Sequence, residues 1–387
     1  MSITELDKQY VANTYARFPL EIVGGKGSKL YDSKGKEYID MGTGIGVSAV
    51  GTCDSEWVAA VTKQLNTLQH TSNLYYSEPC VKLAELLCNK TGAEKVFFSN
   101  SGAEANECAI KCARKWAYDN KGAEYNKIIT LVNSFHGRTI TTLAATGQES
   151  FHKDFLPLTD GFLYAEAGDL HSVESFLKEE KVAGIMFETI QGEGGVVPLS
   201  QEFVSGISAL AEKYNVLLIV DEVQTGNGRT GALYGYMKFG INPDIVSTAK
   251  GIGGGLPLGA TMFFEKTSNT YTPGTHGSTF GGNPVVCAGA ISIIERMTDE
   301  FLQGVEERSQ YIFTELGSAK GVKSITGLGL MLGIETERDV NEILAECREN
   351  GVLPIKAKTK VRLLPPLNIP MEDLKKAVAV IKKACEV

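Results

Sequence analysis

The sequence predicts an α/β protein with a doubly wound, mostly parallel sheet in one large domain and a second, smaller α+β domain. Short apolar runs rich in β-branched residues, typical of buried parallel strands, occur at 127–132, 183–188, 216–222 and 244–248. Helical patterns alternate with them, as at 201–214. This alternation implies right-handed crossovers, and a chain of 387 residues is too long for one ordinary core.

The C-terminal part of the chain has a different pattern. Beyond residue 285, helical segments flank the short strand-like pieces "SITGLGLMLGIE" and "VRLLPP". Near the N-terminus, "GSKLYDSKGKEYIDM" predicts a hairpin that packs with them. We therefore predict an N-terminal segment (1–51) that joins the small domain, a large ligand-binding domain (52–284) and a small C-terminal α+β domain (285–387).

Composition excludes several classes of function. A net charge of -8 argues against a nucleic-acid or anionic membrane partner. No apolar run reaches the roughly 18 residues of a membrane span, and the first residues lack the apolar core of a secretory signal. The 8 cysteines form no C-x-x-C pair, so we expect reduced thiols and a cytoplasmic location. Cys108 and Cys112 have no further ligand at suitable spacing, and no metal site is predicted.

The segment 97–116, "FFSNSGAEANECAIKCARKW", joins a strand end to a helix. Ser101 and Glu104 have the spacing of a capping box. Gly102 would let the backbone approach a ligand, and free amides at a helix start attract anions. From this stretch alone, a well-capped helix with nothing bound is an equal alternative.

The segment "NSFHGRT" (133–139) follows the next predicted strand. Phe135 could stack on a flat ring, and Arg138 could bind a carboxylate through two hydrogen bonds. Taken alone, a core phenylalanine and a surface arginine explain the same residues.

An acid and a lysine follow two further strands. Asp221 ends a strongly apolar strand, where a carboxylate needs a cation such as a protonated pyridine nitrogen or Mg²⁺. Lys250 precedes the glycines of "KGIGGG", whereas a phosphate loop places its glycines before the lysine. A lysine at a strand end, with space beside it, suits a side chain that forms an imine.

Together these segments resemble those of class III aminotransferases, which are fold type I pyridoxal-phosphate enzymes. The resemblance starts near residue 15, continues to the C-terminus, and rests on "SNSGAEANE", "SFHGRT", "QGEGG", "DEVQTGNGRTG", "TAKGIGGGLPLGA", "GSTFGGNP" and "RLLPPL". Within the class, the chain is most similar to acetylornithine aminotransferases. One departure is "GTCDSEW", where the family often has "GHCHP", and this puts the contacts of that loop in doubt.

The resemblance implies pyridoxal 5'-phosphate as the cofactor and Lys250 as the lysine that forms an imine with it and then moves the substrate proton. Asp221 would pair with the pyridinium nitrogen, which keeps the ring an electron sink, and Gln224 would bond the phenolic oxygen. The two faces of the ring would stack on Phe135 and Val223.

The resemblance also implies how the cofactor phosphate is held. Ser101, Gly102 and Ala103 would bind it from one chain, and Thr279 in "GSTF" would reach it from the neighbouring subunit. The expected assembly is therefore a homodimer with shared active sites. Glu188 resembles an acid close to the same cofactor.

Two substrates would share the pocket: N-acetylornithine and 2-oxoglutarate, which leaves as glutamate, in a step of arginine biosynthesis. Arg362 would bind the α-carboxylate of glutamate. Glu193 is expected to act as a switch that pairs with Arg362 when the substrate has no carboxylate there. Arg138 would hold the distal carboxylate of either substrate, helped by Ser278.

The acyl preference rests on Ile45, because ornithine aminotransferases carry a tyrosine near this position and an apolar residue better suits an acylated nitrogen. Other ω-aminotransferase substrates stay open, namely ornithine, 4-aminobutyrate, succinylornithine and succinyldiaminopimelate. A nucleotide-binding ATPase-like module and a cofactor-dependent decarboxylase or aminomutase are alternatives from other classes.

Overall fold

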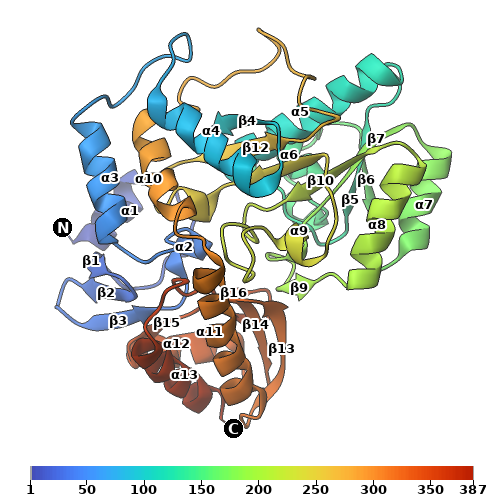
Figure 1. Ribbon diagram of the computed structural model, residues 1–387. Helices are drawn as coiled ribbons and strands as arrows, with labels where there is room; N and C mark the ends of the chain where they lie inside the picture. Colours follow the sequence, from blue (N-terminus) through green and yellow to red (C-terminus); the bar gives the residue numbers. More distant parts are fainter. Residues whose placement is uncertain (1, 387) are drawn as a thin grey trace.

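A seven-stranded sheet forms the centre of the larger part of the molecule in the computed structural model, which describes residues 2–386 (Figure 1). In sheet order the strands are β4 (Lys95–Ser99), β12 (Gly259–Phe263), β11 (Ile245–Thr248), β10 (Leu217–Asp221), β7 (Val182–Phe187), β5 (Lys127–Leu131) and β6 (Phe162–Ala165). Only β12 runs antiparallel to its neighbours. The predicted mostly parallel sheet is confirmed, and the predicted strands match β5, β7, β10 and β11 to within one residue at each end.

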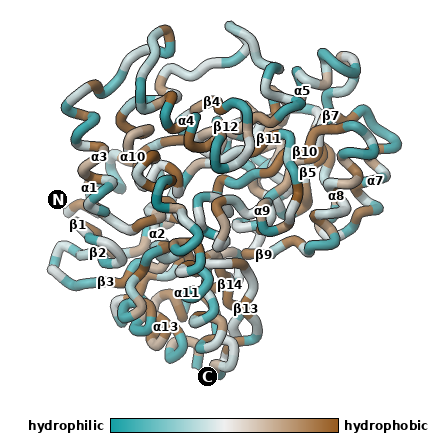
Figure 2. Tube along the Cα trace, in the orientation of Figure 1, coloured by the Kyte–Doolittle hydropathy of each residue, from teal (hydrophilic) through white to brown (hydrophobic). Residues whose placement is uncertain are grey.

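Helices cover both faces of this sheet because its strand residues alternate in direction. Leu217 and Ile219 of β10 join the apolar cluster beneath α5 (Gly102–Asn120), whereas Leu218 and Val220 join the cluster beneath α8 (Gln201–Lys213). Figure 2 shows the resulting band of hydrophobic residues along β5, β7 and β10. The surrounding helices are α3 (Ser55–Leu65), α4 (Glu78–Thr91), α6 (Ile140–Ala145), α7 (Leu170–Glu179), α9 (Gly235–Lys238) and α10 (Pro284–Ile294).

The C-terminal part folds around a second, antiparallel sheet. Its strands, in order, are β13 (Val322–Leu328), β14 (Met331–Thr336), β17 (Lys360–Leu363) and β16 (Ile355–Ala357). Helices α11 (Asp299–Gly317), α12 (Val340–Glu349) and α13 (Met371–Cys385) pack around it (Figure 1).

The N-terminal segment joins this smaller part through a sheet of β1 (Ile22–Lys26), β2 (Lys29–Asp32), β3 (Glu37–Asp40) and β15 (Val352–Leu353). β2 and β3 form the expected hairpin, and β3 pairs with β15 in parallel. α10, which begins at the proposed boundary, packs on α3 and α4 of the larger part. The boundaries of the three units stay a prediction: the pairing of β3 with β15 supports the placement of the N-terminal segment, whereas the packing of α10 does not support a small domain that begins at residue 285.

Short elements complete the chain. They are α1 (Ile3–Tyr10), α2 (Thr43–Gly46), the 3-10 turns η1 (Glu149–Phe151) and η2 (Lys250–Ile252), and the two-stranded ribbon of β8 (Ile190–Gln191) and β9 (Val197–Pro198). Within residues 2–386, no helix is both long enough and apolar enough to cross a bilayer.

Candidate active site

A cavity of about 410 Å³ opens at the carboxyl ends of the parallel strands. This is the edge at which open α/β sheets bind ligands. Most of the predicted site residues lie in its wall, although they come from the ends of β4, β5, β7, β10 and β11 and the loops that follow them. The predicted residues in the wall are Ser101, Gly102, Ala103, Phe135, Arg138, Glu188, Asp221, Val223, Gln224 and Lys250.

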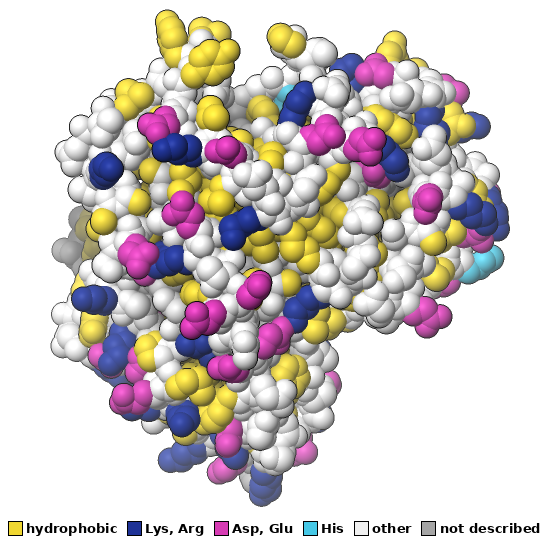
Figure 3. Space-filling model, in the orientation of Figure 1, with side chains coloured by type: hydrophobic (Ala, Val, Ile, Leu, Met, Phe, Trp, Pro, Cys, Tyr) yellow, Lys and Arg dark blue, Asp and Glu magenta, His cyan; other side chains and the backbone are white. Residues whose placement is uncertain are grey.

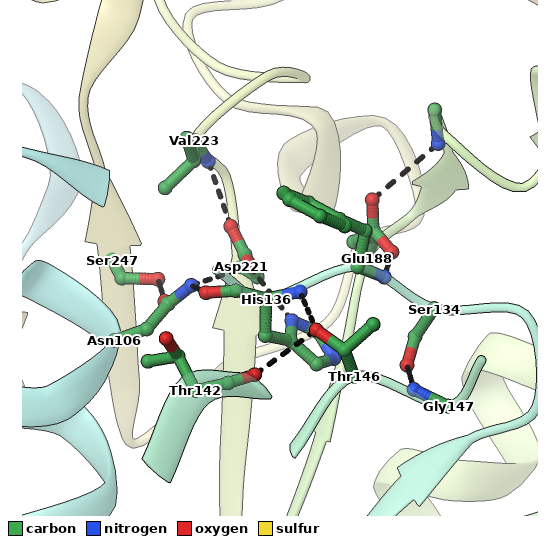
Figure 4. Close-up of polar contacts among 12 residues, drawn as sticks. Asn106, Ser134, His136, Thr142, Thr146, Gly147, Glu188, Asp221, Val223 and Ser247 are labelled. Carbon is green, nitrogen blue, oxygen red and sulfur yellow. Dashed lines mark hydrogen bonds and ion pairs between the residues drawn. The ribbon is translucent and has the colours of Figure 1, made fainter. Parts of the chain in front are cut away.

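Asp221 ends β10 and is only 3 % exposed. Its Oδ2 accepts hydrogen bonds from Asn106 Nδ2 at 2.8 Å and His136 Nδ1 at 2.8 Å, and its Oδ1 accepts one from the Val223 amide at 3.0 Å (Figure 4). Burial works to lower the pKa of His136, but the hydrogen bond to Asp221 and the negative charges of Asp221 and Glu188 together outweigh burial and raise it. These donors fix the direction of a buried carboxylate that faces the cavity.

Asn106 and His136 line the cavity and contact Asp221, and the sequence analysis did not assign them to the site. Asn106 Nδ2 also donates to the His136 carbonyl at 2.7 Å, and Asn106 Oδ1 accepts from Ser247 Oγ at 2.5 Å. The His136 amide donates to Thr146 Oγ1 at 2.9 Å (Figure 4). The sequence signal for Asn106 was a polar residue among the apolar residues of α5. The structure leaves it 1 % exposed, and a buried polar side chain needs a specific partner.

The start of α5 forms the floor of the cavity. Ser101 Oγ caps the helix by accepting from the Glu104 amide at 3.2 Å. The return half of the predicted capping box is shifted by one residue, since the Glu104 carboxylate accepts from the Asn100 amide at 2.8 Å. A Cβ on Gly102 would lie 2.6 Å from Val223 Cγ1, so this close approach requires glycine. Within residues 2–386, the amides of Gly102 and Ala103 have no hydrogen-bond partner, so they are free for an anion.

Lys250 follows β11 in a left-handed conformation with φ 50°, which is uncommon outside glycine and concentrates at functional sites. The Asn227 side chain holds the preceding carbonyl, that of Ala249, at 3.1 Å. Among residues 2–386, no acid or acceptor engages the Lys250 amine within hydrogen-bonding distance. Burial lowers its pKa, which favours the neutral, nucleophilic amine.

Glu193 and Arg362 form an ion pair between the two parts of the molecule. Glu193 lies in the loop between β8 and β9, and Arg362 lies on β17 of the small sheet. Arg362 Nη1 is 2.6 Å from Glu193 Oε1, and the arginine is 3 % exposed. Burial works to raise the pKa of the Glu193 carboxyl, but the charge and hydrogen bond of Arg362, with smaller contributions from Lys250 and Gln224, together outweigh burial and lower it. Gln224 Nε2 also donates to Glu193 Oε1 at 3.4 Å.

Phe135, Arg138 and Glu188 line another part of the cavity. The Phe135 amide donates to Glu188 Oε2 at 2.9 Å, and the Gly192 amide donates to Glu188 Oε1 at 3.4 Å. Burial raises the pKa of Glu188 to about 7. The Arg138 guanidinium lies over the rings of Phe135 and Phe151, in the mouth of the cavity.

Glu193 and Arg362 do not line the cavity themselves, although both contact Gln224, which does. Ser278, Thr279 and Ile45 are also absent from the cavity wall of the same chain. Ser278 Oγ accepts from Asn100 Nδ2 at 3.2 Å, just outside it. Thr279 is exposed in a separate depression of about 360 Å³. Ile45 is 45 % exposed and has φ 66°. Their roles stay predictions.

The cavity fits a planar, phosphorylated pyridine aldehyde. The free amides of α5 suit a phosphate, the buried Asp221 suits a protonated ring nitrogen, and the unpartnered Lys250 amine suits an aldehyde carbon. These chemical features, on a mostly parallel α/β sheet, define a pyridoxal-phosphate enzyme of fold type I.

The chain belongs to the class III aminotransferase family, whose model matches residues 10–385. It is 47 % identical over 381 residues to the acetylornithine aminotransferase of Haemophilus ducreyi, with 98 % of this chain and 97 % of the relative covered. It is 45 % identical over 376 residues to that of Aquifex aeolicus, with 97 % and 99 % covered.

Solved structures agree with this family. N-acetylornithine aminotransferase from Stenotrophomonas maltophilia K279a has a TM-score of 0.84 at 33 % identity, covering 99 % of this chain and 98 % of that one. Ornithine aminotransferase from Toxoplasma gondii has a TM-score of 0.93 at 34 % identity, covering 98 % and 93 %. The protein is therefore a pyridoxal-phosphate-dependent aminotransferase, and the ATPase-like alternative is excluded.

Proposed function

We propose that the protein transfers the terminal amino group of N-acetylornithine to 2-oxoglutarate, as a step of arginine biosynthesis. The observation that carries this proposal is the ion pair between Glu193 and Arg362, both of which contact Gln224 in the cavity wall. A carboxylate-binding arginine with its own removable counter-ion suits two substrates of which only one has an α-carboxylate next to the reacting carbon. The similarity to acetylornithine aminotransferases supports the choice of amine.

In this proposal Lys250 and Asp221 carry the chemistry. The bound cofactor supplies the carbonyl carbon that takes up the amino group and the ring that accepts the electrons left on the substrate carbon. Lys250 Nζ removes the proton from the substrate carbon that bears nitrogen, and its lowered pKa suits this role. Asp221, held by Asn106 and His136, would pair with the ring nitrogen of the cofactor.

Substrate binding is assigned to the arginines. Arg362 binds the α-carboxylate of glutamate, and Glu193 neutralises Arg362 when the amine substrate occupies the site. Arg138, with Ser278, holds the distal carboxylate of either substrate. Ile45 is the proposed apolar contact for the acylated end of N-acetylornithine.

The proposed assembly is a homodimer in which Thr279 completes the phosphate site of the neighbouring subunit. The exposure of Thr279 supports this, and so does the loop between α3 and α4, where Leu74, Tyr75 and Tyr76 are 87 %, 70 % and 100 % exposed. Figure 3 shows hydrophobic side chains gathered on loops that project at the top of this face. Apolar loops of this kind suit a partner surface. The 8 unpaired thiols support a cytoplasmic location.

A panel of amines tests the substrate. N-acetylornithine, ornithine, 4-aminobutyrate, succinylornithine and succinyldiaminopimelate would each be supplied with 2-oxoglutarate, and glutamate formation would be followed. We expect the highest kcat/KM for N-acetylornithine. A clear preference for 4-aminobutyrate would overturn the assignment while leaving the family unchanged.

A further inference from the structure

Arg138 has an unusual environment for a carboxylate-binding arginine. Its guanidinium carbon lies 4.5 Å from the centre of the Phe151 ring and 5.5 Å from that of Phe135. Within residues 2–386, no carboxylate, carbonyl or hydroxyl accepts a hydrogen bond from it. The two rings meet edge to face, with centroids 5.8 Å apart and planes at 69°. The cation therefore rests on aromatic surfaces alone.

An aromatic face holds a guanidinium in a way that an acid cannot. The ring attracts the cation through its quadrupole, so the guanidinium plane is oriented, but the ring offers no lone pair to the N–H groups. The outward N–H fork stays free for a carboxylate, and less side-chain entropy is lost when that carboxylate binds. An acidic neighbour would instead occupy the fork and compete with substrate.

The chain holds Phe151 and Arg138 in fixed positions. Phe151 ends η1, and the preceding Gln148 donates from Nε2 to the Ser134 carbonyl at 3.0 Å, which ties the turn to the segment that carries Arg138. Arg138 follows Gly137, whose φ is 142° and where a Cβ would lie 2.4 Å from Thr142 Oγ1. Phe151 does not line the cavity, whereas Arg138 does, so the Phe151 ring contacts the arginine without contacting a bound ligand.

We propose that Phe151 is a positioning residue for substrate carboxylates, because its ring orients the Arg138 guanidinium toward the cavity. This inference rests on the proposed function, in which Arg138 holds the distal carboxylate of both substrates. It assigns Phe151 no contact with substrate or cofactor. Removing the Phe151 ring is therefore expected to raise KM for both N-acetylornithine and 2-oxoglutarate.

A double-mutant cycle tests the proposal. Phe151→Leu should raise KM for both substrates by about 3- to 30-fold, the range expected for a cation–π contact, while kcat changes less than about twofold. Phe151→Tyr keeps the aromatic face and should restore KM. In an Arg138→Ala background, Phe151→Leu should add nothing, because the group that it orients is gone. Phe155→Leu, an exposed phenylalanine four residues along the same segment, is the matched control and should leave KM unchanged.

The outcomes separate the two proposals. If Arg138→Ala leaves KM unchanged for both substrates, the carboxylate-binding role in the proposed function fails, and the inference fails with it. If Arg138→Ala raises KM but Phe151→Leu does not, only the inference is overturned. The inference is also overturned if Phe151→Leu raises KM by the same factor with and without Arg138, since its effect would then not pass through the arginine.

Discussion

Removing the Glu193 carboxylate should affect the two half-reactions unequally. In the proposed function, the amine substrate places no carboxylate near Arg362, so Glu193→Ala leaves a buried guanidinium unpaired in that half-reaction. Glutamate brings its own α-carboxylate to Arg362, and Glu193 has to leave. Its loss there removes a competitor, and we expect kcat/KM for glutamate to stay unchanged or rise.

The structure sets the size of this effect. Truncating one partner of a buried, hydrogen-bonded charge pair costs about 2–5 kcal/mol. Arg362 is 3 % exposed and the N–O distance is 2.6 Å, but the Glu193 side chain is 30 % exposed, so water can partly replace it. We therefore expect the lower part of the range, about 2–3 kcal/mol, which is a loss of about 30- to 150-fold in kcat/KM for N-acetylornithine.

Single-turnover stopped-flow measurements separate the half-reactions, because the cofactor absorbance changes as each amine or keto acid reacts. Glu193→Ala would be mixed with N-acetylornithine and, separately, with glutamate. Glu202→Ala, an exposed acid at the start of α8, serves as the matched control. An equal loss in both half-reactions would refute the switch, since Glu193 would then support the site in a way that does not depend on the substrate.

Three further predictions concern Lys250 and two buried charged residues, Glu222 and Arg229. Lys250→Ala should reduce turnover below detection while the purified protein still binds the cofactor, as measured by fluorescence titration, because the phosphate and ring contacts remain. Burial raises the pKa of Glu222 to about 7 from an ordinary value near 4.5, so its contribution to stability is fully present below pH 4.5 and is lost as the pH rises through about 7. Between pH 4.5 and 7, the free energy of unfolding measured by urea titration should therefore fall by about 3 kcal/mol less in Glu222→Gln than in the unmodified chain. An equal fall in both proteins would contradict this. Arg229→Met should lower the free energy of unfolding by about 2–4 kcal/mol. The reason is that Arg229 donates hydrogen bonds to the carbonyls of Leu330 and Pro365, which would lose their partner. A urea midpoint unchanged from the parent would show that those bonds contribute nothing to stability.

The sequence was sufficient wherever a pattern is local. A continuous apolar run located β10, and the acid at its end made Asp221 a candidate site residue because strand ends of a parallel sheet share one edge. The glycines after Lys250 likewise indicated a lysine with free space beside it. The ion pair of Glu193 and Arg362 came from the resemblance, and the structure places the two side chains together.

Tertiary partners could not be found in this way. Asn106 contacts Asp221 across 115 positions of the chain, and no local pattern states that distance. The shift of the Glu104 carboxylate from the Ser101 amide to the Asn100 amide depends on the loop before α5, which propensity does not describe. Thr279 differs again, because the phosphate site that it is proposed to complete belongs to another subunit. The geometry of one chain therefore cannot show that contact.

The two carboxylate-binding arginines differ in a way that the proposed chemistry explains. Arg362 has an acid as its partner, and Arg138 has a phenyl ring. In the proposed function, Arg138 meets a substrate carboxylate in both half-reactions, so a permanent acid beside it would compete in both. Arg362 meets one in only a single half-reaction, and without Glu193 it would be a bare buried cation in the other. An acidic partner is useful only where a substrate carboxylate is present in one half-reaction and absent in the other. An aromatic ring is sufficient where both substrates bring a carboxylate.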